Sequence, residues 1–179
     1  DLRIVQAGPL RARVEITRSF GDSRVVQGVA LDAESTAVDF DLVVDWRERS
    51  RVLKVGFPLA VRAARATAEI QFGHIERPVA VNTSWDQARF ETSGQRWLLL
   101  REPGYGVALA NDSSYGHDVH PARTAPGAST VGVDAGLTLL RAPNAPDPAA
   151  DLGSHTFAYS LTVGADVRAA HRAGIRLNL

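Results

Sequence analysis

Apolar and polar residues alternate along much of this chain with the period of two that is typical of β-strands. Between residues 10 and 17, one parity carries the apolar side chains Leu10, Ala12, Val14 and Ile16. This pattern predicts a strand with one buried and one solvated face. In Val38–Val44 the residues Val38, Phe40 and Leu42 share one parity, and the other parity carries Asp39 and Asp41. A second strand of the same kind is therefore predicted there.

Many further short apolar segments are separated by glycine and proline, which are typical of turns. Strands are predicted at Val25–Ala30, Val52–Phe57, Ala66–Phe72, Trp97–Leu100, Gly106–Ala110, Leu137–Leu140 and Phe157–Val163. Pro58 is expected to close its strand, because proline cannot donate a hydrogen bond to a β-ladder. Many short strands with turns between them favour an all-β sandwich or barrel.

One segment near the end of the chain has a helical pattern. A helix is predicted over Asp166–Ala173 with Gly174 as its C-cap, and the apolar Ile175–Leu177 is expected to lead into another strand or domain. The loop Ala142–Gly153 is long, acidic and rich in proline. Loops of this length are often functional, although a rigid solvated connection explains the composition equally well.

Composition narrows the functional classes. The 179 residues are 45% hydrophobic and include 20 basic and 20 acidic residues, so no strongly basic face is expected and nucleic acid is not a predicted partner. Cysteine is absent, which excludes disulfides. No apolar run approaches the roughly 18 residues of a membrane span. Because the chain starts at Asp1 without methionine, we expect a fragment of a longer multidomain protein that forms one domain over 1–179.

Two groups of residues resemble catalytic or metal sites. Asp147 and Asp151 lie on one loop, and a glycosidase uses two carboxylates. A turn and a backbone cap are the more ordinary roles for them. His117 and His120 have a spacing seen among metal ligands, but no further residues complete a closed site, so no metal is predicted in this chain.

The segment Glu69–Glu91 is unusually polar and carries a tryptophan. Trp85 offers a flat apolar face that suits a sugar ring or a protein core. Asn82, Asp86 and Arg89 supply groups that hydrogen-bond hydroxyls. On this chemistry alone, we favour a loop that packs against a neighbouring domain through Trp85.

Five blocks in order resemble the C-terminal β-region of glycoside hydrolase family 38 α-mannosidases, in particular the cytosolic and vacuolar subgroup. They are VDWRERSRVLKVGFP (44–58), EIQFGHIERP (69–78), NTSWDQARFE (82–91), YGVALANDSSYGHDVH (105–120) and LTLLRAPNAPDPAADLGSHTFAYSL (137–161). Two departures are Val79, where the family often has threonine, and the longer segment Ala122–Val133.

The resemblance implies a large antiparallel β-sandwich of the galactose mutarotase-like supersandwich type with a short C-terminal helix. It implies a cytoplasmic, retaining exo-α-mannosidase that acts on terminal α-linked mannose of oligosaccharides. The zinc ion and the nucleophile would belong to a catalytic domain outside this chain, so the resemblance assigns no catalytic residue or metal ligand here. Candidates for the pocket wall or the domain interface are His74, Arg77, Asn82, Trp85, Asp86, Arg141, Asp147 and Asp151.

Two other functions fit part of the pattern. An autonomous carbohydrate-binding module would use exposed aromatic residues, for which Trp46, Trp85, Trp97 and Tyr115 are available. A β-sandwich that serves only homo-oligomer contacts is the third possibility, but it does not explain the five ordered blocks.

Overall fold

The computed structural model describes residues 1–122 and 132–179, so most of the divergent segment 122–133 lies outside the described residues. In chain order the elements are β1 (Leu2–Ala7), β2 (Arg11–Phe20), β3 (Ser23–Asp32), β4 (Ala37–Trp46), β5 (Leu53–Leu59), β6 (Arg65–Ile70), β7 (Gly73–Pro78), α1 (Ser84–Gln87), β8 (Thr92–Ser93), β9 (Trp97–Glu102), β10 (Tyr105–Asn111), β11 (Gly116–Pro121), β12 (Val133–Leu140), β13 (Gly153–Val163) and α2 (Val167–Asn178).

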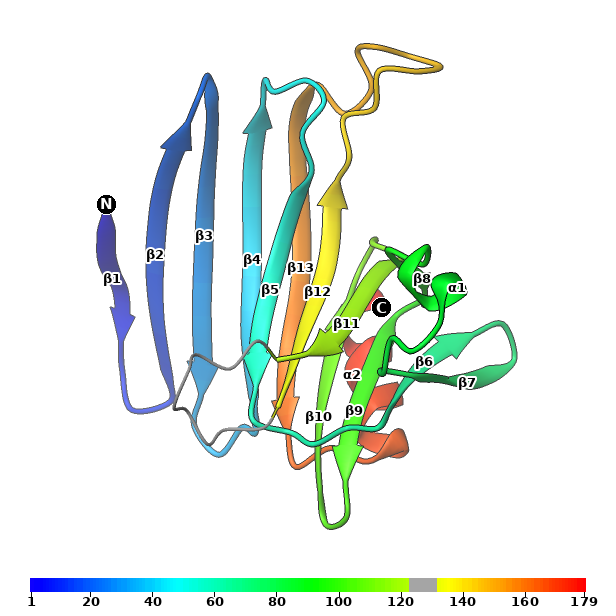
Figure 1. Cartoon of the computed structure of the whole chain (residues 1–179). Coiled ribbons are helices and arrows are strands. Elements are labelled where there is room, and N and C mark those ends of the chain that lie inside the picture. Colours follow the sequence, from blue (N-terminus) through cyan, green and yellow to red (C-terminus); the bar gives the residue numbers. More distant parts are fainter. Residues whose placement is uncertain (123–131) are drawn as a thin grey trace, which may run out of the picture.

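The strands form two antiparallel sheets that pack face to face (Figure 1). The larger sheet has nine strands in the order β1-β2-β3-β4-β13-β10-β9-β6-β7, and the smaller has the order β5-β12-β11-β8. The predicted antiparallel β-sandwich with a short C-terminal helix is confirmed. No helix in the described part of the chain is long and apolar enough to cross a membrane.

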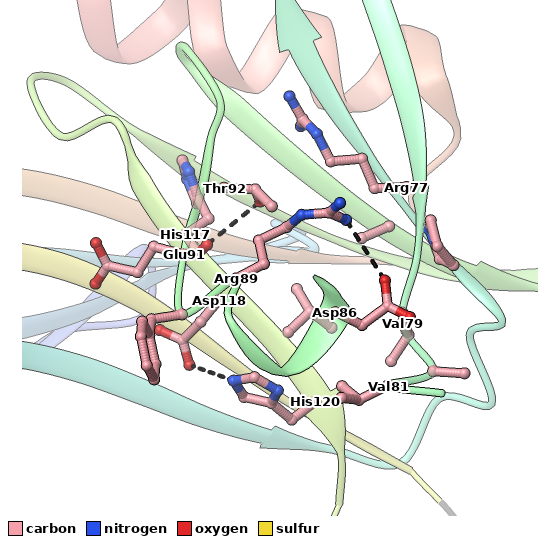
Figure 2. A pocket seen from close by; sticks show the side chains of 15 residues that line it. Arg77, Val79, Val81, Asp86, Arg89, Glu91, Thr92, His117, Asp118 and His120 are labelled. Atoms are coloured by element: carbon pink, nitrogen blue, oxygen red, sulfur yellow. Dashed lines mark hydrogen bonds and ion pairs between the residues drawn. The ribbon is translucent and has the colours of Figure 1, made fainter. Parts of the chain in front are cut away.

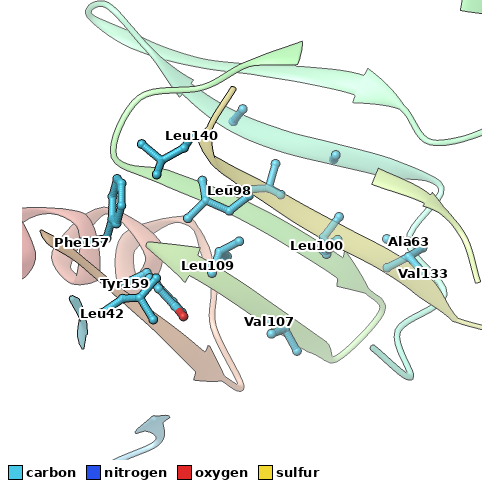
Figure 3. Close-up of a cluster of buried hydrophobic side chains, with 14 of the residues drawn as sticks. Leu42, Ala63, Leu98, Leu100, Val107, Leu109, Val133, Leu140, Phe157 and Tyr159 are labelled. Carbon is cyan, nitrogen blue, oxygen red and sulfur yellow. The ribbon is translucent and has the colours of Figure 1, made fainter. Parts of the chain in front are cut away.

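The main core fills the space between the two sheets (Figure 3). Leu98 and Leu109 from the large sheet and Leu137 from the small sheet are each at most 2% exposed. Trp46 is equally buried and packs edge-on against Phe20, with ring centroids 5.7 Å apart. Burial of Trp46 and Trp97 removes two of the four aromatic residues considered for sugar stacking.

A second core lies between the outer face of the large sheet and α2. Trp97, Leu99 and Ala108 of β9 and β10 pack against Ala170 and Ala173 of the helix. The helix begins at Val167, one residue after its predicted start, and Asp166 is its N-cap, because the Asp166 carboxylate accepts a hydrogen bond from the Ala169 amide at 2.7 Å.

The predicted end of this helix is wrong. The helix continues to Asn178, so Ile175–Leu177 is helical and does not lead into another strand. Gly174 lies inside the helix, where a Cβ atom would be 3.0 Å from Cδ1 of Trp97. Glycine is therefore required here by close packing against the sheet and not by a left-handed C-cap.

Three strand predictions need correction. Pro58 does not close its strand, because β5 runs to Leu59; proline is tolerated there because β5 is an edge strand. Phe72 lies in the turn after β6, with φ of +63°, and is fully exposed. The strand predicted over residues 10–17 exists as β2, which begins at Arg11, but its apolar residues Val14 and Ile16 are only half-buried.

The reason for this exposure is the unequal size of the two sheets. The smaller sheet covers β4, β13, β10 and β9, and Val25 of β3 still reaches the core between the sheets. In contrast, β1, β2 and most of β3 project past its β5 edge (Figure 1). The nine-stranded sheet therefore has a covered half and a half, made of β1, β2 and most of β3, that lacks a second layer among the described residues.

Candidate functional site

A cluster of charged residues lies on the outer face of the small sheet, turned away from the core. The Lys54 ammonium of β5 forms ion pairs with Glu91, at 3.0 Å, and with Asp118 of β11. Thr138 of β12 donates a hydrogen bond to the same Glu91 oxygen. The register of the sheet explains the cluster, because Lys54 lies opposite Thr138, which in turn lies opposite Gly116.

Two glycines leave room for the carboxylates of this cluster. A Cβ atom at Gly136 would collide with the Asp118 carboxylate, and one at Gly116 would be 3.0 Å from Oε2 of Glu91. The small sheet thus presents a nearly bare backbone surface, onto which Glu91 and Asp118 are folded.

The electrostatics of the cluster keep Glu91 ionised. Partial burial raises the pKa of the Glu91 carboxyl, but the hydrogen bonds from Thr138 and Lys54 outweigh it, and the pKa lies below its ordinary value. Burial lowers the pKa of Lys54, but its hydrogen bonds to Asp118 and Glu91 outweigh this effect, so the pKa lies above its ordinary value. At neutral pH, Glu91 can accept hydrogen bonds from hydroxyl groups but is a poor proton donor.

An open hollow of about 730 Å³ lies next to this cluster. It is lined by aromatic, basic and acidic side chains, namely Val52, Lys54, Trp85, Ala88, Arg89, Phe90, Glu91 and Arg141. Trp85 and Phe90 are more than 80% exposed. A flat aromatic face beside fixed hydrogen-bonding groups suits either a sugar or a second protein surface.

The segment that carries Trp85 is held by a capped helical turn. The Thr83 hydroxyl accepts a hydrogen bond from the Asp86 amide, and the Asp86 carboxylate accepts one from the Thr83 amide, each at 3.1 Å. This capping box fixes α1, and the hydrogen bonds from Thr83 and Asn82 lower the pKa of the Asp86 carboxyl. The helical turn thereby presents Trp85 to solvent.

Of the predicted site residues, the structure brings only Trp85 and Arg141 together in this hollow. Arg77 and Asp86 line a neighbouring pocket of about 40 Å³, which has room for only a few water molecules. Asn82 precedes α1, and its backbone amide donates a hydrogen bond to the Asp86 carboxylate at 3.3 Å. His74 lies on the opposite side of the large sheet, beside Trp97, with ring centroids 6.0 Å apart.

Asp147 and Asp151 serve the backbone of their own loop. Asp147 accepts a hydrogen bond from the Ala149 amide, and Asp151 accepts from the amides of Arg141 and Ala142, all within 2.9 Å. Their more ordinary interpretation, as a turn and a cap, is therefore supported. Within the described residues, the Arg141 guanidinium makes no ion pair with either aspartate.

The two histidines of β11 point to opposite faces of the small sheet. His120 meets Asp118 at 3.6 Å on the outer face, whereas the fully buried His117 lies apart from them (Figure 2). In residues 1–122 and 132–179, no three His, Cys, Asp or Glu side chains come together as metal ligands. The zinc ion that the family resemblance implies would belong to a catalytic domain outside this chain, and the described residues supply no ligand set for it.

Sequence reasoning missed Lys54, Glu91, Asp118 and Thr138 as a group. The chain's only lysine is Lys54, which was a signal, but four segments far apart in sequence build the cluster. Only the pairing of β5, β12 and β11 brings them together.

Comparison with known proteins identifies the family. Residues 1–149 match the profile described as the glycosyl hydrolases family 38 C-terminal domain. The chain belongs to glycosyl hydrolase family 38. It is 49% identical over 140 residues to human alpha-mannosidase 2C1, and 43% identical over 164 residues to alpha-mannosidase G of Dictyostelium discoideum. These matches cover 78% and 89% of this family 38 chain but only 12% and 14% of the two relatives.

Solved structures show the same fold. An alpha-mannosidase from Enterococcus faecalis V583 superposes on 91% of the family 38 chain, with a TM-score of 0.73 and 17% identity, and the match spans 22% of that protein. A putative aldose 1-epimerase from Escherichia coli K12 matches the same share of the chain, with a TM-score of 0.52 and 14% identity, and 68% of its own length is covered. The mutarotase-like fold expected from the sequence is thus confirmed.

Proposed function

We propose that this chain is the accessory C-terminal β-sandwich domain of a retaining exo-α-mannosidase, which hydrolyses terminal α-linked mannose of oligosaccharides. The match of residues 1–149 to the family 38 C-terminal domain carries this proposal. The zinc site and the nucleophile then belong to the rest of the polypeptide, which is the domain's main partner. The likeness to the cytosolic and vacuolar subgroup supports a cytoplasmic location.

Within that enzyme, we propose that the hollow between Trp85 and Arg141 faces the catalytic domain and forms part of the pocket wall. The exposed aromatic side chains of Trp85 and Phe90 favour contact with another surface. Glu91 can accept, and Arg141 can donate, hydrogen bonds to sugar hydroxyls. His74, on the far side of the large sheet, is not part of this wall.

Kinetics of the longer polypeptide that carries this domain test the proposal. In it, Arg141→Ala should lower kcat/KM for an aryl α-mannoside by about tenfold or more, the loss expected when a charged hydrogen bond to substrate is removed. The matched control is Arg168→Ala on α2, on the opposite side of the sheet, which should leave the rate unchanged. The 179-residue chain alone should show no turnover; zinc-dependent turnover by it would overturn the assignment.

An autonomous carbohydrate-binding module is the second candidate, because Trp85 is 83% exposed beside fixed polar groups. Calorimetric titration of the 179-residue chain with mannose or mannan distinguishes the two functions. Binding that is lost in Trp85→Ala would favour the module, and no heat up to millimolar sugar would exclude it.

A further inference from the structure

A second hollow lies on the face of the large sheet that is turned away from the small sheet. It has a volume of about 820 Å³ and lies between the first turn of α2 and the hairpin of β6 and β7, and we call it the helix hollow. Helix α2 packs on β9 and β10 and leaves this part of the sheet open (Figure 1). Three arginines and two histidines line the hollow, against two carboxylates. A concave site with an excess of basic groups attracts anionic ligands.

The first of the two carboxylates, Glu69, is already neutralised. It is 4% exposed, and Arg96 donates three hydrogen bonds to it at 2.5–3.0 Å, from its backbone amide and from Nε and Nη2 of its guanidinium. Burial raises the pKa of the Glu69 carboxyl, but these hydrogen bonds lower it more, so Glu69 stays ionised at neutral pH. Glu69 therefore holds Arg96 in place and leaves its Nη1 atom for another acceptor.

The second carboxylate, Asp166, serves as the cap of α2. It accepts a hydrogen bond from the Ala169 amide at 2.7 Å. The two amides that precede Ala169 in the first turn have no acceptor inside the helix, and Val167 of that turn lines the hollow. Amides at the start of a helix of 12 residues attract negative charge. Neither carboxylate therefore cancels the positive charge around the hollow.

The remaining polar groups of the hollow are hydrogen-bond donors with weak partners. The Arg101 guanidinium is half exposed and lies 3.5 Å from the Glu76 carboxylate. The His171 ring is also half exposed and lies 3.6 Å from Glu69. Trp97 in the floor is only 2% exposed, yet its indole N–H has no acceptor within the described residues, although buried donors normally have one. The hollow thus has spare donors and no spare carboxylate.

The rim of the hollow carries an aromatic ring in an unusual backbone conformation. Phe72, in the turn between β6 and β7, has φ of +63°, which a bulky residue rarely adopts. Its side chain is fully exposed, so burial of the ring does not offset this strain. Strain of this kind is concentrated at functional positions, and a flat exposed ring is suited to stacking on a sugar. The volume of the hollow is typical of sites for small organic ligands.

We propose that the helix hollow binds a small phosphorylated sugar, such as a hexose phosphate. The phosphate group lies among Arg96, Arg101, His171 and the first turn of α2, because its oxygens accept hydrogen bonds and carry negative charge. The sugar ring lies against Phe72 at the rim. This site is separate from the hollow at Trp85, so the inference goes beyond the proposed hydrolysis and does not depend on it.

Calorimetric titration of the 179-residue chain with inorganic phosphate and with glucose 6-phosphate tests the site. Both should bind, and glucose 6-phosphate should bind at least about threefold more tightly, because only its sugar ring can contact Phe72. Arg101→Gln and His171→Gln change half-exposed side chains and should each weaken the binding of both ligands by about five- to tenfold. The matched control is Arg172→Gln, an exposed arginine of the same helix outside the hollow, which should bind both ligands like the parent chain.

The variant Phe72→Ala separates the two parts of the site. It should weaken the binding of glucose 6-phosphate by at least about threefold and leave the binding of inorganic phosphate unchanged. The substitution removes a fully exposed ring, so the fold should persist, and circular dichroism of each variant checks this.

Three results would overturn the inference. The first is the absence of heat with either ligand up to millimolar concentrations. The second is an equal loss of binding in Arg172→Gln and Arg101→Gln, which would mean that the ligands respond only to the net charge of the chain. The third is equal binding of the two ligands that Phe72→Ala does not change, because the hollow would then take free phosphate and not a sugar phosphate.

Discussion

The two halves of the nine-stranded sheet differ in what packs on them, and this difference controls burial more than strand sequence does. In β9, the consecutive residues Leu98 and Leu99 are both at most 1% exposed, because the small sheet covers one face and α2 the other. In β2, no residue is fully buried, although Val14 and Ile16 have β-branched side chains suited to a core. An apolar residue on a strand thus predicts a face suited to burial, but whether the residue is buried depends on whether another layer packs on that face.

The largest expected effect sharpens this comparison with one substitution at two places. Leu98→Ala should destabilise the chain by about 2–5 kcal/mol, because it leaves a cavity between the two sheets. Leu31→Ala at the uncovered end of β3 should cost less than about 1 kcal/mol, because about half of the side chain is already exposed to water. Urea unfolding of both variants measures the difference, and equal losses of stability would show that Leu31 is covered in solution.

The same comparison explains what could be predicted from the sequence. Strand positions and the parity of Val38–Val44 follow from local alternation, and both appear in β4. The unbroken apolar run Trp97–Leu100 is typical of a strand buried on both faces, but which layers cover it is decided by distant segments. Similarly, the sequence offered Trp85 and Arg141 as candidates, but it did not predict that Lys54 and Glu91 line the same hollow.

The packing of α2 against the covered half of the large sheet can be tested at Gly174. Gly174→Val should destabilise the chain by about 1–3 kcal/mol, because the new side chain would overlap Trp97 and the Arg96 stem. The matched control is Arg172→Val, an exposed position of the same helix, which should cost about 0.5 kcal/mol through helix propensity alone. Thermal unfolding measures both. Similar losses at the two positions would show that the helix is not closely packed against the sheet.

The small sheet adds a pH dependence that comes from a buried histidine. Burial lowers the pKa of His117 below its ordinary value of 6.5, so the folded chain binds this proton less readily than the unfolded chain. Stability should therefore fall as the pH is lowered below about 6.5, by at most about 1.4 kcal/mol for each pH unit. The loss should level off once the pH falls below the lowered pKa of the folded state.

Replacing this histidine should remove the dependence. In His117→Phe, the urea midpoint should change less between pH 7 and pH 5.5 than in the parent chain. His120→Gln on the same strand is the matched control, because that ring is 47% exposed. If the urea midpoint changed equally with pH in the parent chain and in His117→Phe, another group would control stability in this pH range.

The smallest effect is expected on the polar face of β2, β3 and β4, where Arg13 reaches across Gly28 to pair with Asp41 at 2.5 Å. Because Asp41 is about half exposed, Arg13→Gln should cost only about 0.2–1 kcal/mol, and the cost should shrink in 1 M NaCl. A double-mutant cycle with Asp41→Asn isolates the pair. A coupling energy above about 2 kcal/mol that does not respond to salt would mean that this face is shielded from water.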